Sequence, residues 1–169
     1  MLLIITDKYH YLSKESIFEK NDFMKIYKLH DLKEIKEASL FYPPSMESIQ
    51  KCFYDFKNEF NVELPDGYLD FLKVSNGYIW KSLVVFGTRL QQMPDKDVNL
   101  DGIIEKNRYY YPQIKLAGFI VLGSTSDFLI VFDTKNQNYR IINSITNEIY
   151  RTFDSLKSVL FHYTTEGLE

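Results

Sequence analysis

The sequence has a single cysteine, three histidines and one tryptophan, and it contains no long hydrophobic run. The lone thiol of Cys52 cannot form an internal disulfide, which is typical of proteins in a reducing cytoplasm. The opening MLLIITDKYH has only five apolar residues and no basic lead-in, which is too short for a signal peptide or a membrane span. We therefore expect a cytoplasmic protein without a membrane segment.

The sequence also lacks a basic excess, since 20 Lys and Arg stand against 23 Asp and Glu, for a net charge of −3. A duplex-binding protein normally shows a basic stripe, so we expect no direct contact with nucleic acid. The excess acid lies between residues 43 and 76, which hold six acidic and three basic side chains. These charges form either two solvated helix faces or a docking face that steers a basic partner.

The clearest helix of the sequence begins after Ser45, a good N-cap residue. Its apolar residues fall on one stripe, namely Met46, Ile49, Cys52, Phe53, Phe56 and Phe60. Pro65 ends that region and can begin a second helix over residues 66–75, which Asn76 and Gly77 terminate. The apolar run that follows predicts a buried strand over residues 79–87.

The second half is rich in strand patterns separated by short turns. We expect strands over residues 117–123, 127–133, 138–143 and 148–151, and a closing helix over 154–164. Near the N-terminus we expect a strand at 2–5, a strand or hairpin near 9–30 and a short helix at 31–38. The fold class predicted is therefore α+β, one domain over 1–169 whose mainly antiparallel β-sheet is covered by helices on one face.

One run of residues resembles a known family. It reads E-L-P-x-x-Y-x-x-F-L-x-x-x-N-G from Glu63 to Gly77 and is followed by an apolar strand that ends in Gly87. Together with I-V-L-G-S-T at 120–125 and D-F-L-I-V-F-D at 127–133, it is similar to the SUKH superfamily of cell-wall-regulator and immunity-type domains. The YrhA-like branch matches best. The similarity covers residues 38–164, and residues 1–37 match poorly.

This resemblance implies a non-catalytic bacterial immunity-type protein. Such a protein binds and neutralises a cognate polymorphic toxin, for example a basic nuclease or deaminase, by occluding its active site. The family has no agreed catalytic residues, so the resemblance transfers none. A housekeeping protein-interaction or scaffold domain of the same fold is the alternative, and a small-ligand binder or enzyme is a third reading.

The partner-binding residues that we predict are carboxylates and aromatics on and beside the second helix: Glu59, Glu63, Asp66, Tyr68, Asp70, Tyr78 and Trp80. The carboxylates would pair with cationic groups of the toxin, and the aromatics would anchor it. The alternative interpretation of this pair is that Trp80 packs under the loop that follows the helix.

The sequence predicts no catalytic residue, metal site or cofactor. Residues 97–104 imitate the first part of a calcium loop, but Arg108 occupies the twelfth position, where the ion needs a bidentate Glu. We expect instead a polar loop that leads into a helix over 99–110, capped by Asn99. Cys52 lies on an apolar stripe, which favours a buried structural thiol over a nucleophile. The three histidines, His10, His30 and His162, share no ligand spacing.

Overall fold

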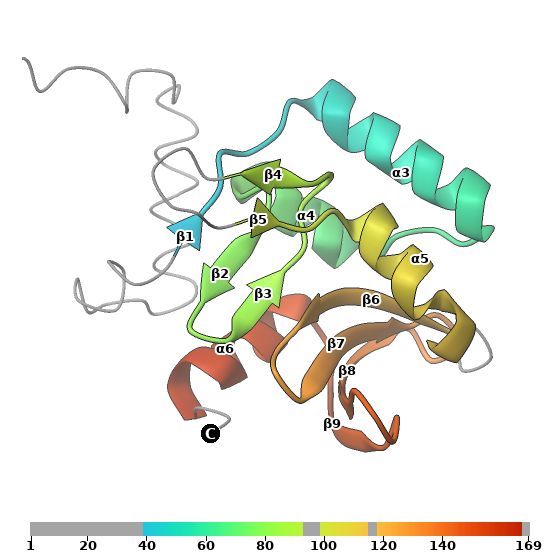
Figure 1. Cartoon of the computed structure of the whole chain (residues 1–169), viewed down its shortest axis with the longest axis vertical. Coiled ribbons are helices and arrows are strands. Elements are labelled where there is room, and N and C mark those ends of the chain that lie inside the picture. Colours follow the sequence, from blue (N-terminus) through green and yellow to red (C-terminus); the bar gives the residue numbers. More distant parts are fainter. Residues whose placement is uncertain (1–38, 93–98, 115–117, 167–169) are drawn as a thin grey trace, which may run out of the picture.

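The computed structural model describes residues 39–92, 99–114 and 118–166 (Figure 1). The strand expected at 2–5, the strand or hairpin near 9–30 and the helix at 31–38 lie outside the described residues, as does the poorly matched segment 1–37. No helix in the described ranges is both long enough and apolar enough to cross a membrane.

An antiparallel sheet of seven strands forms the body of the described chain, in the order β1-β2-β3-β6-β7-β8-β9. Its strands are β1 (Ser39–Leu40), β2 (Tyr78–Trp80), β3 (Leu83–Val85), β6 (Phe119–Ser124), β7 (Phe128–Asp133), β8 (Asn138–Asn143) and β9 (Ile149–Phe153). A separate pair consists of β4 (Gln91–Gln92) and β5 (Asn99–Leu100). The strands from β6 to β9 follow one another as hairpins, which is the meander that the turn spacing predicted.

Four helices accompany the sheet in the described residues: α3 (Met46–Phe60), α4 (Asp66–Val74), α5 (Ile103–Ile114) and α6 (Leu156–Glu166). The α+β class is therefore confirmed. The hydroxyl of Ser45 accepts a hydrogen bond from the backbone N–H of Ser48, so the predicted N-cap of α3 is confirmed. Met46, which we placed on the apolar stripe of α3, is exposed, and the stripe begins at Ile49.

Two local expectations were wrong. The run 79–87 is not one strand, because the polar pair Lys81–Ser82 turns the chain between β2 and β3, with Lys81 at a φ of 52°. Asn99 does not cap α5, since it pairs with Gln92 in the β4–β5 ladder and the helix begins four residues later. In both cases the local sequence pattern favours one element, a single strand or a helix start, but antiparallel pairing of two short strands forms instead. The contacts between the paired strands outweigh the local preference.

The core joins the buried stripes of α3, α4 and α6 to the inner side chains of the sheet. The helix α6 packs on β8 and β9 and touches α4, while α3 touches α4 and α5 lies along β6 (Figure 1). The last five residues of β7 are buried. Because successive side chains of a strand point to opposite faces, this central strand is covered on both faces. The helix α4 is thereby fixed on the core, and its outward side is open to solvent.

The side chain of Asn107 attaches α5 to the edge of β6. The strand β6 pairs with β3 only through Gly123 and Ser124, so the backbone of Val121 on that edge needs another partner. The amide of Asn107 donates to the carbonyl oxygen of Val121 at 2.8 Å and accepts from its N–H at 2.9 Å. The helix therefore covers a sheet edge that would otherwise leave buried backbone groups unpaired.

Candidate partner-binding site

The predicted carboxylates lie at and around α4. Glu63, Asp66 and Asp70 are exposed, and Asp66 and Asp70 are separated by one turn of the helix. Behind them the buried side chains of Tyr68, Phe71 and Leu72 hold α4 on the core. Asp66 and Asp70 are therefore presented to solvent by a rigid element, whereas Glu63 lies in the loop before it.

The hydroxyl of Tyr139 on β8 lies against the first turn of α4. A methyl group added at Gly67 would approach that hydroxyl oxygen to 2.4 Å, so only glycine leaves room for it. Burial, together with the negative charges of Asp66 and Asp70, raises the pKa of Tyr139 to about 12. Tyr139 is therefore protonated at neutral pH, and both carboxylates lie close to it.

Most of the predicted carboxylates already have an ion-pair partner. Arg108 of α5 binds Glu59 with two nitrogens, and its Nη2 lies 2.6 Å from Oε2. Glu63 pairs with Lys57 at 2.5 Å, which lowers the pKa of Glu63, and Asp70 pairs with Lys73 at 2.9 Å. Asp66 has no ion pair with any residue that the structure describes.

These pairs weaken the electrostatic field that the sequence suggested. Arg108 lies outside residues 43–76 in the sequence but beside them in space, and adding its charge changes their net charge from −3 to −2. Exposed ion pairs of this kind contribute little to stability, about 0–1 kcal/mol each. The structure leaves Asp66 as the predicted carboxylate that a cationic partner can reach without displacing an ion pair, and Asp70, one turn away, is exposed but paired with Lys73.

The three predicted aromatic anchors are core residues, which corrects the expectation for them. Tyr68 is 0% exposed, Tyr78 2% and Trp80 4%. The hydroxyl of Tyr68 donates to the carbonyl oxygen of Phe86 at 2.7 Å, and the ammonium of Lys81 lies 4.5 Å from the centre of the Trp80 ring. Tyr78 and Trp80 stand on strand β2, where both are buried in the hydrophobic core.

The thiol of Cys52 is buried, as expected for a structural cysteine. Burial, together with the negative charges of Asp55 and Glu105, raises its pKa to about 12. A thiol with that pKa is almost entirely protonated at neutral pH and is a poor nucleophile.

The calcium-like segment uses its charges for ion pairs within the protein. Asp101 pairs with Lys106 at 2.9 Å, and Arg108 pairs with Glu59. No cluster of three or more His, Cys, Asp or Glu side chains that could bind a metal occurs within the described ranges.

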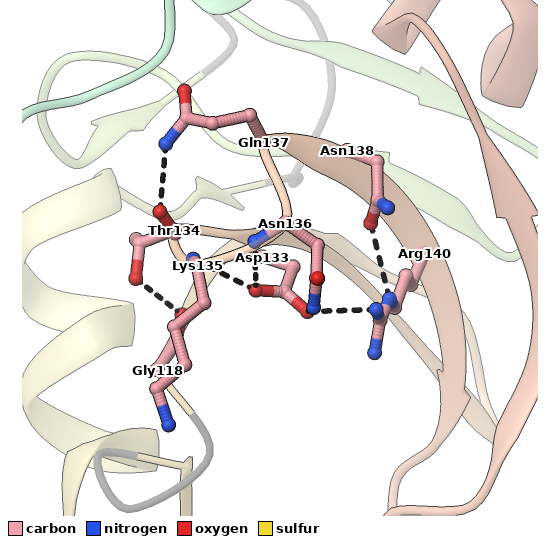
Figure 2. Close-up of polar contacts among 8 residues, drawn as sticks. All are labelled: Gly118, Asp133, Thr134, Lys135, Asn136, Gln137, Asn138 and Arg140. Atoms are coloured by element: carbon pink, nitrogen blue, oxygen red, sulfur yellow. Dashed lines mark hydrogen bonds and ion pairs between the residues drawn. The ribbon is translucent and has the colours of Figure 1, made fainter.

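The most connected polar cluster lies at the β7–β8 turn, and Figure 2 shows its hydrogen bonds. The carboxylate of Asp133 accepts from the backbone N–H groups of Lys135 and Asn136 and pairs with Arg140 at 2.8 Å. The guanidinium of Arg140 also lies over the ring of Phe119. The contacts of Asp133 close the turn and tie it to Arg140 on β8, so we assign this cluster a structural role.

A surface that the sequence did not single out lies at the β8–β9 hairpin. Ile145, Ile149 and Tyr150 are all exposed there, and the ring of Tyr150 packs on Phe128 at 5.3 Å. The sequence feature that could have predicted this surface is Ile145, a β-branched apolar residue inside the turn S-I-T-N. Polar residues and glycine are usual at such positions.

No family model matches the chain, and no curated protein matches it.

Proposed function

We propose that this chain is a non-catalytic protein-binding domain of the immunity type, which neutralises a toxin domain by covering its active site. The observation that carries the proposal is the pair Asp66 and Asp70, exposed one turn apart on a helix whose other side is locked into the core. In this proposal the chain contacts the toxin through these two carboxylates, and Glu63 and Glu59 lie at the edge of the contact surface.

The geometry of α4 favours tight recognition for a physical reason. Tyr68, Phe71 and Leu72 are buried beneath the carboxylates, so binding does not have to order the helix. Preorganisation of this kind reduces the entropic cost of association. A carboxylate pair at fixed spacing also selects for a partner with cationic groups at a matching spacing.

The chemistry of the partner follows from the sign of this charge. A nuclease or a nucleic-acid deaminase must attract phosphates, so its substrate cleft is cationic. A rigid acidic helix can enter such a cleft and exclude the substrate without any reaction. The resemblance of the chain to SUKH immunity-type domains supports the same class of partner.

The test begins with the proteins encoded beside this gene. Each is expressed alone and together with the full chain, and growth of the host cells is recorded. We expect one of them to arrest growth, the chain to restore it, and the purified pair to form a complex. A neighbour that binds without being toxic would support the housekeeping interaction domain instead.

The contact residues are tested on that purified pair by surface plasmon resonance. The double variant D66N/D70N keeps the shape of both side chains and removes two charges. We expect the association rate to fall about tenfold at low salt, with a weaker salt dependence. The matched control is D127N, which removes an exposed carboxylate at the β6–β7 turn. An unchanged association rate in D66N/D70N would refute α4 as the contact surface.

A further inference from the structure

The strand β9 is the last strand of the main sheet in the described part of the chain. It pairs with β8 on one side, and residues 148–152 are all exposed. Ile149 is 50% exposed and Tyr150 56%, although both are large apolar side chains. An exposed sheet edge with apolar side chains is a template for pairing with another strand.

The residues on this edge do not block such pairing. Proteins usually protect an edge with proline, lysine, several like charges or a β-bulge, and of these devices β9 has only the bulge at Tyr150. The segment from Glu148 to Phe153 reads E-I-Y-R-T-F and carries one acid, one base and no proline. Its charges are therefore balanced within four residues.

The hairpin that ends in β9 is rigid at its turn. The side-chain oxygen of Asn143 accepts hydrogen bonds from the N–H groups of Ile145 and Thr146, both at 2.9 Å. Asn147 has a φ of 60°, the left-handed conformation that asparagine tolerates. The start of β9 is thus held in one conformation before any partner binds.

A β-bulge places the two charges of this edge on the same face of the sheet. Ile149 pairs with Ile142 and Arg151 pairs with Ile141, so Tyr150 is an extra residue. Ile141 and Ile142 are neighbours on a strand, so their side chains point to opposite faces of the sheet. Their partners, Arg151 and Ile149, therefore also point to opposite faces. Glu148 precedes Ile149 and shares the face of Arg151. Without the bulge, residues three apart would lie on opposite faces.

We propose that β9 is a self-association edge, which pairs in antiparallel fashion with β9 of a second copy of this chain. A two-fold axis between Ile149 and Tyr150 sets Glu148 against Arg151 of the second copy, and the same pair repeats on the other side of the axis. Both charges share one face, as two-fold pairing of strands requires. Tyr150 then lies beside the axis, opposite Ile149 of the second copy.

The position of Arg151 fits this role. Its Nη1 lies 3.0 Å from Nδ1 of His162 on α6, and its guanidinium lies over the ring of Phe153. These contacts hold the arginine over the face that it shares with Glu148. The residues from Glu148 to Arg151 read acid, apolar, apolar, base. When one of two such strands is reversed, the acid of each lies opposite the base of the other, so a second copy of the chain is a complementary partner.

The experiment is sedimentation velocity of the full chain, from about 5 to about 500 µM, the range in which a small interface associates. We expect the mass to rise from the 20.1 kDa monomer towards twice that value. The variants E148R and R151E each place like charges opposite one another, so each alone should remain monomeric. Mixed in equal amounts, they should form a heterodimer, since Arg then faces Glu at both ends.

The control is E47R, which reverses an exposed carboxylate on α3, far from β9 in the sequence, and should associate like the wild type. Far-UV circular dichroism checks the fold of each variant. If R151E does not fold, Y150R replaces it, because two arginines at the axis must also abolish association. A wild type that stays monomeric at every concentration, or a mixture of E148R and R151E that does not associate, would overturn the proposal.

Discussion

Replacement of Asn107 by alanine tests how α5 is held on the sheet. The Asn107 side chain is buried, and it bonds both backbone groups of Val121 as well as the carbonyl oxygen of Ile103. Alanine removes all three hydrogen bonds and leaves the N–H and the C=O of Val121 buried without a partner. The helix propensity of alanine only partly offsets this loss.

The size of the effect follows from those two orphaned groups. Each buried, unpaired backbone group costs about 1–3 kcal/mol, so N107A should lower the free energy of unfolding by about 2–5 kcal/mol. A domain typically has only about 5–15 kcal/mol of stability in total. At roughly 2–4 °C per kcal/mol for a chain of this size, the midpoint of thermal unfolding should fall by about 4–20 °C.

Urea denaturation measures this directly, because Trp80 is the only tryptophan and is buried. Its fluorescence reports on the core without interference from a second indole. The matched control is N58A, on the exposed side of α3, which should change stability by less than about 0.5 kcal/mol. A loss of less than about 1 kcal/mol in N107A would refute the account of Asn107 as the partner of the β6 edge.

Two further predictions concern single side chains. The thiol of Cys52, with a pKa of about 12, should react with a thiol reagent at pH 8 only as fast as the protein unfolds, and rapid modification of the native protein would contradict its burial. Burial raises the pKa of Asp133, but hydrogen bonds from Asn136 and Lys135 and the charge of Arg140 outweigh it and hold the pKa below the ordinary 3.8. The stabilisation by the ionised carboxylate is present above pH 3.8 and is lost as the pH falls through the pKa of Asp133 in the folded protein. D133N should therefore lower the free energy of unfolding by about 2 kcal/mol at pH 7 and by progressively less in acid. An equal cost at pH 7 and pH 3 would contradict this sign.

Much of the fold followed from local patterns. The stripe of α3 and its Ser45 cap, the break at Pro65 and the three hairpin turns after β6 each depend on residues close together in sequence. Spacing rules work there because the same few residues make the decisive contacts. They failed at residues 79–87, where a two-residue turn interrupts an otherwise apolar run.

The candidate site was harder to predict, because exposure and pairing depend on distant residues. Tyr68, Tyr78 and Trp80 have the chemistry of binding anchors, but only the packing of α4 and β2 on the core shows that they are buried. Arg108 neutralises Glu59 across 49 positions of the chain, a distance at which no spacing rule applies.

The sequence alone determined the α+β class, the order of most helices and strands, and the acidic character of residues 43–76, since each depends on local periodicity or on composition. Only the tertiary structure decided which of those acids remain accessible, how Asn107 completes the edge of β6 and where a bulge brings Glu148 and Arg151 to one face. These features arise from contacts between segments far apart in the chain, and such contacts form only when the whole core is assembled.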